Sequence, residues 1–190
     1  GLGLLLAMGI PANGFAVDWN ERVTLLFSER VRGEFTDWFR PPGNTAGAER
    51  YNFLGSQLRI GVALTLPHVQ LVVEGQDTRL ANLPDDASDP PGPLGPGATY
   101  FLNTRATTQG EPFLKRGFLT VRRSGLAATV GRFEYQDGLE TEPADPTLAF
   151  LKRTRIAERL VGAFGFTHVS RSFDGGRLSP RSDGCDGRAI

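Results

Sequence analysis

Hydrophobic and polar residues alternate along most of this chain with a period of two. The clearest example is LGSQLRIGVALTLPHVQLVVEGQD, from Leu54 to Asp77. One side of this stretch is a row of aliphatic residues: Leu54, Leu58, Ile60, Val62, Leu64 and Leu66. The other side is polar, and after a short turn the next segment extends it: Gln57, Arg59, Thr65, Gln70, Glu74 and Gln76. Since successive side chains of a strand point to opposite faces, the pattern predicts β-strands with one apolar and one polar face.

The same alternation predicts an all-β fold. Six segments carry it: 24–38, 53–66, 69–79, a stretch around Phe118, 126–135 and 162–173. Each is close to, or somewhat longer than, the roughly 9–11 residues that cross a membrane as a tilted strand. We therefore expect an antiparallel up-and-down meander of about six strands. Helix signals are scarce, and the best of them, 148–162, predicts a short helix within a loop.

The predicted connections alternate in length. Segments 39–52, 80–112 and 136–161 are long, whereas 67–68 and 122–125 are short. Outer-membrane barrels show this asymmetry, with short periplasmic turns and long external loops. The loop that begins at Leu80 is rich in Pro, Gly and Asp; because strand pattern resumes after it, we interpret it as an external loop rather than a domain linker.

The first sixteen residues resemble a truncated signal peptide. An apolar run is followed by Pro11 and then by small residues at Gly14 and Ala16, the two positions that a signal peptidase reads. This predicts export and a mature N-terminus at Val17. The run is too short to span a membrane as a helix. An exported N-terminus starts in the periplasm, so the first connection should be external and long, as it is here.

Periodicity alone leaves the inside of the protein undecided. In a soluble sandwich the aliphatic row would face a core, whereas in an outer-membrane barrel it would face lipid and the polar row would line the lumen. The signal-like N-terminus, the alternating connections and the strand lengths favour the barrel. Aromatic residues at strand ends also suit interfacial girdles, although a soluble barrel could show them too: Trp38, Phe39, Phe53, Phe133 and Tyr135.

Composition narrows the chemistry. The formal net charge is zero, so no global field attracts nucleic acid. Lysine occurs only at 115 and 152, so 19 of the 21 basic residues are arginine, which suits contacts with carboxylates but also follows from codon usage. One cysteine and two histidines make a zinc site improbable, and a solvated loop explains Asp85, Asp86 and Asp89 better than calcium does. No pattern marks a catalytic site, so we expect neither an enzyme nor a cofactor.

Five segments in order are similar to the alginate export family of outer-membrane β-barrels. They are RVRGEF, LRIGVAL, VVEGQDTR, LAATVGRFEYQDGLE and RIAERLVGAFGFTHVSRSFDGGRL, and they extend over residues 22–178. The resemblance implies a many-stranded channel whose arginine-rich lumen passes a negatively charged polyuronate. It also implies a fragment, because six strands are fewer than the roughly eight of the smallest closed barrels. We therefore expect residues 17–178 to be the N-terminal part of a larger barrel, followed by a tail, 179–190, that lies outside the family pattern and resembles a frameshift.

Strand phase assigns the lumen side. The residues expected to line the pore and contact substrate are Arg30, Arg32, Glu34, Arg59, Glu74, Gln76, Arg116, Arg132 and Glu134. On the fourth strand this places Lys115 on the opposite side from Arg116. On the fifth it places Phe133 and Tyr135 outward, which leaves Val130 in the lumen, while Arg171 stays unassigned. Several modest cationic sites in series can attract carboxylates and still release them; alternatively, the charged pairs only rigidify the wall.

Three functions remain open at this point. The first is an outer-membrane channel for an anionic solute such as an acidic polysaccharide. Its expected partners are membrane lipid and the anion, with periplasmic secretion components as a further candidate. The second is a general diffusion porin with no dedicated polymer. The third is a soluble periplasmic β protein that binds carbohydrate.

Overall fold

The structure, a computed structural model, describes residues 4–9, 13–39, 42, 47–88, 92–137, 141, 143–157 and 159–180. Its strands are β1 (Leu4–Gly9), β2 (Asn13–Asp18), β3 (Val23–Asp37), β4 (Arg50–Thr65), β5 (Val69–Ala81), β6 (Gln109–Arg123), β7 (Leu126–Phe133) and β8 (Phe173–Pro180). The helical elements are α1 (Pro96–Thr104), α2 (Pro146–Leu151) and a π-helical turn, η1 (Lys152–Ala157). None of the helices within these ranges is long and apolar enough to cross a membrane.

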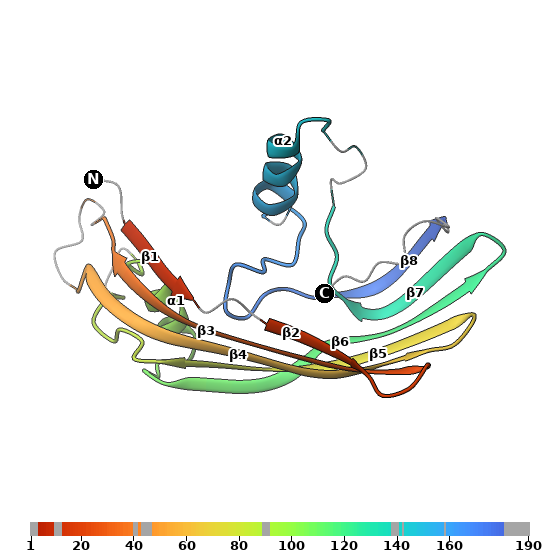
Figure 1. Ribbon diagram of the computed structural model, residues 1–190. Helices are drawn as coiled ribbons and strands as arrows, with labels where there is room; N and C mark the ends of the chain where they lie inside the picture. The colour runs from red at the N-terminus through yellow and green to blue at the C-terminus, as the bar shows by residue number, and fades with distance from the viewer. Residues whose placement is uncertain are drawn as a thin grey trace. The chain divides into compact units, whose positions relative to one another are not determined.

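The strands form one sheet in the order β1-β3-β4-β5-β6-β7-β8, with β2 also paired to β3 (Figure 1). From β3 to β8 the spatial order is the chain order, which is the predicted meander. The pairs β1–β3, β6–β7 and β7–β8 are antiparallel, and Gly117 faces Arg132 across the β6–β7 pair. The predicted all-β class is confirmed. The described sheet is open, with β8 at one edge and β1 and β2 at the other.

The chain divides into two compact units that share β3 to β6. The first comprises Gly1–Asn13, Ser28–Leu58 and Asp77–Pro112, and the second comprises Gly14–Phe27, Arg59–Gln76 and Phe113–Ile190. The first holds the apolar clusters, and the second holds most of the predicted site.

Five of the six predicted strands correspond to β3 through β7, and the short turns and long connections lie between them as expected. The sixth prediction, 162–173, is wrong: this segment forms turns, and β8 begins only at Phe173. Phe164 and Ser170 have positive φ values of 52° and 56°, which a strand cannot accommodate. The amide of Ser170 donates to Thr167 Oγ1, so local side-chain hydrogen bonds replace a strand ladder.

Both ends of the chain add strands that the sequence did not indicate. Residues Leu4–Gly9, within the predicted signal peptide, pair with β3, and signal cleavage itself stays a prediction. At the other end β8 continues to Pro180, two residues beyond the expected limit of the family-like region. The rest of the predicted tail lies outside the described residues.

In the first unit, helix α1 interrupts the long connection between β5 and β6, where only a loop was expected. Gly95 precedes it with a φ of 89°, and Pro96 occupies its first turn. Tyr51 of β4 donates its hydroxyl to Leu94 O at 2.8 Å and accepts from the amide of Gly97 at 3.1 Å. A Cβ on Gly97 would lie 2.5 Å from the Tyr51 ring, so the close approach requires glycine. The buried cluster beneath consists of Phe53, Leu80, Leu83 and Phe101.

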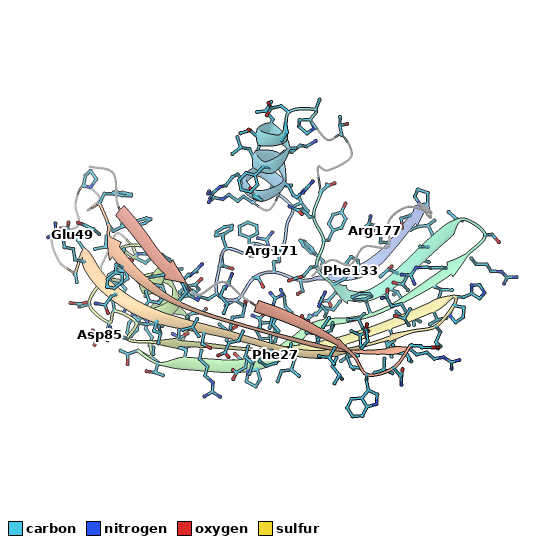
Figure 2. All side chains as sticks on the ribbon, in the orientation of Figure 1. Phe27, Glu49, Asp85, Phe133, Arg171 and Arg177 are labelled. Carbon is cyan, nitrogen blue, oxygen red and sulfur yellow. The ribbon has the colours of Figure 1, made fainter. Side chains whose placement is uncertain are left out.

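The two faces of the sheet are reversed relative to an ordinary soluble protein. On β4 the aliphatic row is exposed, with Ile60 at 59% and Leu54 at 49%, whereas Gln57 of the same strand is buried. Neighbouring strands repeat the pattern. The exposed face also carries Leu25, Phe27, Val62, Leu71, Val73, Leu114, Leu119, Val121 and Val130 (Phe27 is labelled in Figure 2). Most large apolar side chains of these strands therefore point outward and several polar ones are buried, although Phe53, Val72 and Leu80 are buried on the polar side.

Candidate functional site

The second unit gathers charged side chains from three adjacent strands onto one face of the sheet. Strand alternation places Arg59 of β4 and both Glu74 and Gln76 of β5 on this face, as the sequence predicted. Arg116 joins them from β6, and Glu134 joins them from the residue that follows β7. Glu74 is 4% exposed and Gln76 is 1% exposed. Five of the predicted site residues thus lie close together.

Glu134 is bound by two cations at once. Its Oε1 lies 3.3 Å from Nη1 of Arg59 and 3.1 Å from Nζ of Lys115. Arg59 also donates from Nε to Gln76 Oε1 at 2.9 Å. One carboxylate thus holds both cations in place.

Arg116 and Glu74 form a second, bidentate pair. Nε of Arg116 lies 3.1 Å from Oε1 of Glu74, and Nη2 lies 2.6 Å from Oε2. Paired N–H donors of this kind match the geometry of a carboxylate and hold both side chains in one orientation. The Arg116 guanidinium is consequently occupied by a protein carboxylate.

Lys115 is the site residue that the sequence analysis missed. It was expected on the opposite side from Arg116, yet it is 0% exposed and both residues reach the same cluster. The exposed side chain has an even number at Leu114 but an odd number at Leu119. The alternation of exposed and buried side chains therefore changes phase within β6. An extra residue in a strand has this effect. The only available signal was Gly117, because glycine inside a strand often marks such an irregularity.

A connecting segment lies over this cluster. We call residues 163–172 the strap; they precede β8 and run above the sheet in Figure 1. Gln76 Nε2 donates to Val169 O at 2.8 Å, and Arg59 Nη2 donates to Ser170 Oγ at 3.0 Å. Lys115 Nζ donates to Arg171 O at 2.9 Å.

A fourth bond runs the other way, because Ser172 Oγ donates to Lys115 O at 2.8 Å. Two buried polar side chains of the sheet, Gln76 and Lys115, thus satisfy two backbone carbonyls of the strap, those of Val169 and Arg171.

Arg132 does not join the cluster, and the structure reverses the predicted phase of β7. Val130 is among the most exposed apolar residues, and Arg132 shares its side of the strand. Arg132 pairs across the strands with Asp174 of β8 at 2.6 Å. The Phe133 ring meets the Phe118 ring edge-on at 6.5 Å, on the side predicted to be the lumen. The error came from assigning Phe133 to an outward aromatic girdle, which forced Val130 inward.

The remaining predicted residues lie on β3 in the first unit. Arg30, Arg32 and Glu34 occupy alternate positions on one side of the strand, as expected, and Glu34 is buried. Arg32 Nη2 lies 2.5 Å from Glu34 Oε1. Here too an arginine is paired with a carboxylate two residues away on the same face.

The cluster is a set of satisfied ion pairs rather than an open reactive centre. Its cations are engaged by Glu74 and Glu134. Across the described ranges, no three His, Cys, Asp or Glu side chains gather into a possible metal site. What the arrangement can do is hold a connecting segment in a fixed position on the polar face.

A scan against protein-family models, a search of curated proteins and a search of solved structures each found no match to this chain. Similarity to the alginate export family accordingly stays a prediction from the sequence.

Proposed function

We propose that this chain forms part of the wall of an outer-membrane β-barrel, with its polar face directed to a pore that passes an anionic solute such as an acidic polysaccharide. The observation that carries the proposal is the reversal of the two faces. Large aliphatic side chains are exposed along four neighbouring strands, β4 to β7, while Gln57, Glu74, Gln76 and Lys115 of β4, β5 and β6 are buried.

Lipid is the environment in which this arrangement is favourable. In water, a sheet gains stability by removing apolar surface from solvent, at about 25 cal/mol per Å². A soluble sandwich would therefore bury the row that contains Ile60 and Val62, yet both are at least 40% exposed. Against hydrocarbon the same row needs no protein partner, and the polar side chains instead face a lumen. This counts against the soluble carbohydrate-binding alternative.

The two open edges of the sheet need strand partners if the chain lies in a membrane. Unpaired backbone N–H and C=O groups cannot face the hydrocarbon region, because each costs several kcal/mol. In a membrane both β8 and the β1–β2 edge must pair with further strands. The proposed barrel therefore contains more strands than those described.

A general diffusion porin is the second candidate, and the ion pairs of the cluster favour it. Arg59 and Arg116 were expected to attract anions, but both are engaged by carboxylates. A lumen wall whose charges are already neutralised would select weakly between anions and cations. The choice between the two candidates depends on which cations remain available.

The membrane assignment is tested by fractionation after export in a Gram-negative host. We expect the protein to sediment with outer membranes and to need detergent for extraction. Recovery in a buffer-soluble periplasmic fraction would show that the assignment is wrong. For material that forms channels in planar bilayers, the reversal potential under a salt gradient then separates the candidates, since an anion channel prefers anions most strongly in dilute salt, and a general porin shows little preference.

A further inference from the structure

An arginine lies on the apolar face of the sheet, in the first unit. Strand alternation places Arg79 of β5 on the same side as Leu71 and Val73, which are exposed. The Arg79 side chain is 74% exposed, so it projects from the face that the proposed function directs to lipid. An arginine is unfavourable against hydrocarbon and favourable beside lipid headgroups. The depth of Arg79 in the membrane therefore decides what it contacts.

The position of Arg79 along β5 gives this depth. The strand begins at Val69, after the short turn that the proposed barrel places at its periplasmic end, and Arg79 lies ten residues beyond it. These residues extend about 33 Å along the strand, at about 3.3 Å each. A strand tilted by about 40° then rises about 25 Å, which is the height of the apolar band of outer-membrane barrels. Arg79 lies at the external boundary of this band, at the level of the lipid headgroups.

A groove of about 450 Å³ opens beside Arg79. Ser56 of β4 and Thr108, which precedes β6, contribute hydroxyl groups to it, and among its lining residues Arg79 is the charged one. Gly110 leaves room for the arginine, because a Cβ there would lie 3.2 Å from Arg79 Cγ. The lining residues are Leu54, Ser56, Arg79, Leu80, Ala81, Thr108, Gln109 and Gly110.

The outward side of β5 changes character below the groove. Beyond Asp77, the outward positions toward the turn are Gly75, Val73 and Leu71, which carry no polar side chain. A polar groove with a cation thus lies directly above an apolar surface. A lipid has the same order of groups, with a charged headgroup above its acyl chains.

Asp77 orients the arginine and leaves part of its guanidinium available. Arg79 Nε donates to Asp77 Oδ2 at 2.9 Å, and within the described ranges the guanidinium makes no other hydrogen bond. The N–H groups of Nη1 and Nη2 can therefore bind a second anion. Because Asp77 already holds the side chain, less conformational freedom is lost when that anion binds.

We propose that this groove binds a phosphate-bearing membrane lipid, with the phosphate on the Nη groups of Arg79 and the acyl chains along Val73 and Leu71. The inference rests on the membrane assignment made above. A guanidinium binds phosphate oxygens through paired N–H donors, and phosphate is the anionic group that lipids present at this depth. Strand alternation places Arg79 on the opposite face from Glu74 and Gln76, so the lipid site is separate from the path of the solute.

The test uses the full chain in detergent and titrates it with phosphatidic acid, while native mass spectrometry measures the bound lipid. We expect Arg79→Gln to weaken binding by about tenfold, because a charge-assisted hydrogen bond to the phosphate is lost. Arg50→Gln is the matched control. Arg50 is also exposed and also donates from Nε to an aspartate, Asp37 Oδ2, at 3.1 Å, but it does not line the groove. Its loss should change binding by less than about twofold.

A second kind of variant fills the groove and keeps every charge. Gly110→Leu should weaken the binding of phosphatidic acid severalfold, because the new side chain occupies the space beside Arg79. If the thermal melt shows that Gly110→Leu does not fold, Ser56→Leu fills the groove from β4 instead. A folded variant of this kind that binds like the wild type would show that the lipid does not enter the groove.

Two further probes identify what is recognised. Diacylglycerol with the same acyl chains lacks the phosphate, and the wild-type protein should bind it at least about tenfold more weakly. Equal binding of diacylglycerol would show that the phosphate is not recognised. Inorganic phosphate lacks the acyl chains and should not displace the lipid at equal concentration. Displacement would overturn the assignment to a lipid and leave only a site for free phosphate.

The groove is the wrong site if folded Arg79→Gln binds phosphatidic acid as well as the Arg50→Gln control does. If this happens while the protein still sediments with outer membranes, only the lipid site is wrong and the proposed function stands. If the protein is recovered in the buffer-soluble periplasmic fraction, the proposed function itself fails.

Discussion

At the scale of single residues, the main result concerns Lys115. A fully buried lysine is rare unless its charge is paired, and here it contacts both the Glu134 carboxylate and the Arg171 carbonyl. Strand phase placed Arg59 and Glu74 on one face, where both lie, but it could not show that a segment more than a hundred residues away from Arg59 along the chain would be bound to it. The sequence therefore predicted most residues of the site, but not how they contact one another and the strap.

Replacing Lys115 with Met should release the strap. The change keeps a similar length but leaves the Arg171 carbonyl without its donor and Glu134 with one cation fewer. Leaving a buried partner unsatisfied costs about 1–3 kcal/mol. Amide hydrogen exchange should become faster across 163–172 while the strands stay protected, and the thermal midpoint should fall.

Lys152→Met is the matched control, because Lys152 is the other lysine and bonds to Thr141 O within the long connection rather than to the sheet. Equal exchange in the strap of both variants would show that Lys115 does not hold it.

At the scale of elements, the β6–β7 hairpin depends on glycine. Gly131 has a φ of 126°, and a Cβ there would lie 2.2 Å from Gly117 O on the paired strand. Gly117 lies at the edge of the region where β6 changes phase and brings Lys115 to the cluster. The close approach of the β6 and β7 backbones thus helps to position Lys115 in the cluster.

Gly131→Ala should disrupt this hairpin. Both the backbone conformation and the contact with Gly117 O are incompatible with a side chain. We therefore expect the free energy of unfolding to fall by about 1–3 kcal/mol or more. Urea titration in detergent measures this. Gly175 is the register partner of Gly131 on β8, and a Cβ there meets nothing within 4 Å. Gly175→Ala should have little effect, and equal effects of the two substitutions would contradict the argument.

At the scale of the whole molecule, the exposed apolar face distinguishes a membrane wall from a soluble sheet. A charge placed on that face has opposite consequences in the two environments. In water it is harmless at a position as exposed as Ile60, whereas near the middle of a bilayer an arginine costs about 2–4 kcal/mol.

Ile60→Arg should therefore reduce assembly into outer membranes, measured as the fraction of exported protein that sediments with them. Thr65→Arg is the control for an added charge, since Thr65 is exposed on the opposite, polar side of the same strand, where an arginine does not meet lipid. If Ile60→Arg leaves membrane assembly unchanged and raises solubility in buffer, the apolar face does not contact lipid.

The sequence by itself determined the strands β3 to β7, their order and the two-faced character of the sheet. These follow from local rules, because side-chain alternation and turn residues act over a few positions. The same rules placed Arg59, Glu74 and Gln76 on one face. They failed for 162–173, where alternation is present but side-chain hydrogen bonds and two positive φ values produce turns.

Only the tertiary structure decided which face is exposed, which cations are occupied and where the strap lies. The bonds from Lys115 and Arg59 to the strap join residues that are far apart in sequence, so no local pattern encodes them. Sequence alternation is identical for a strand that faces a core and one that faces lipid. The difference appears only when the neighbouring strands and the segment that covers one face are in place, because burial is a property of the assembled sheet.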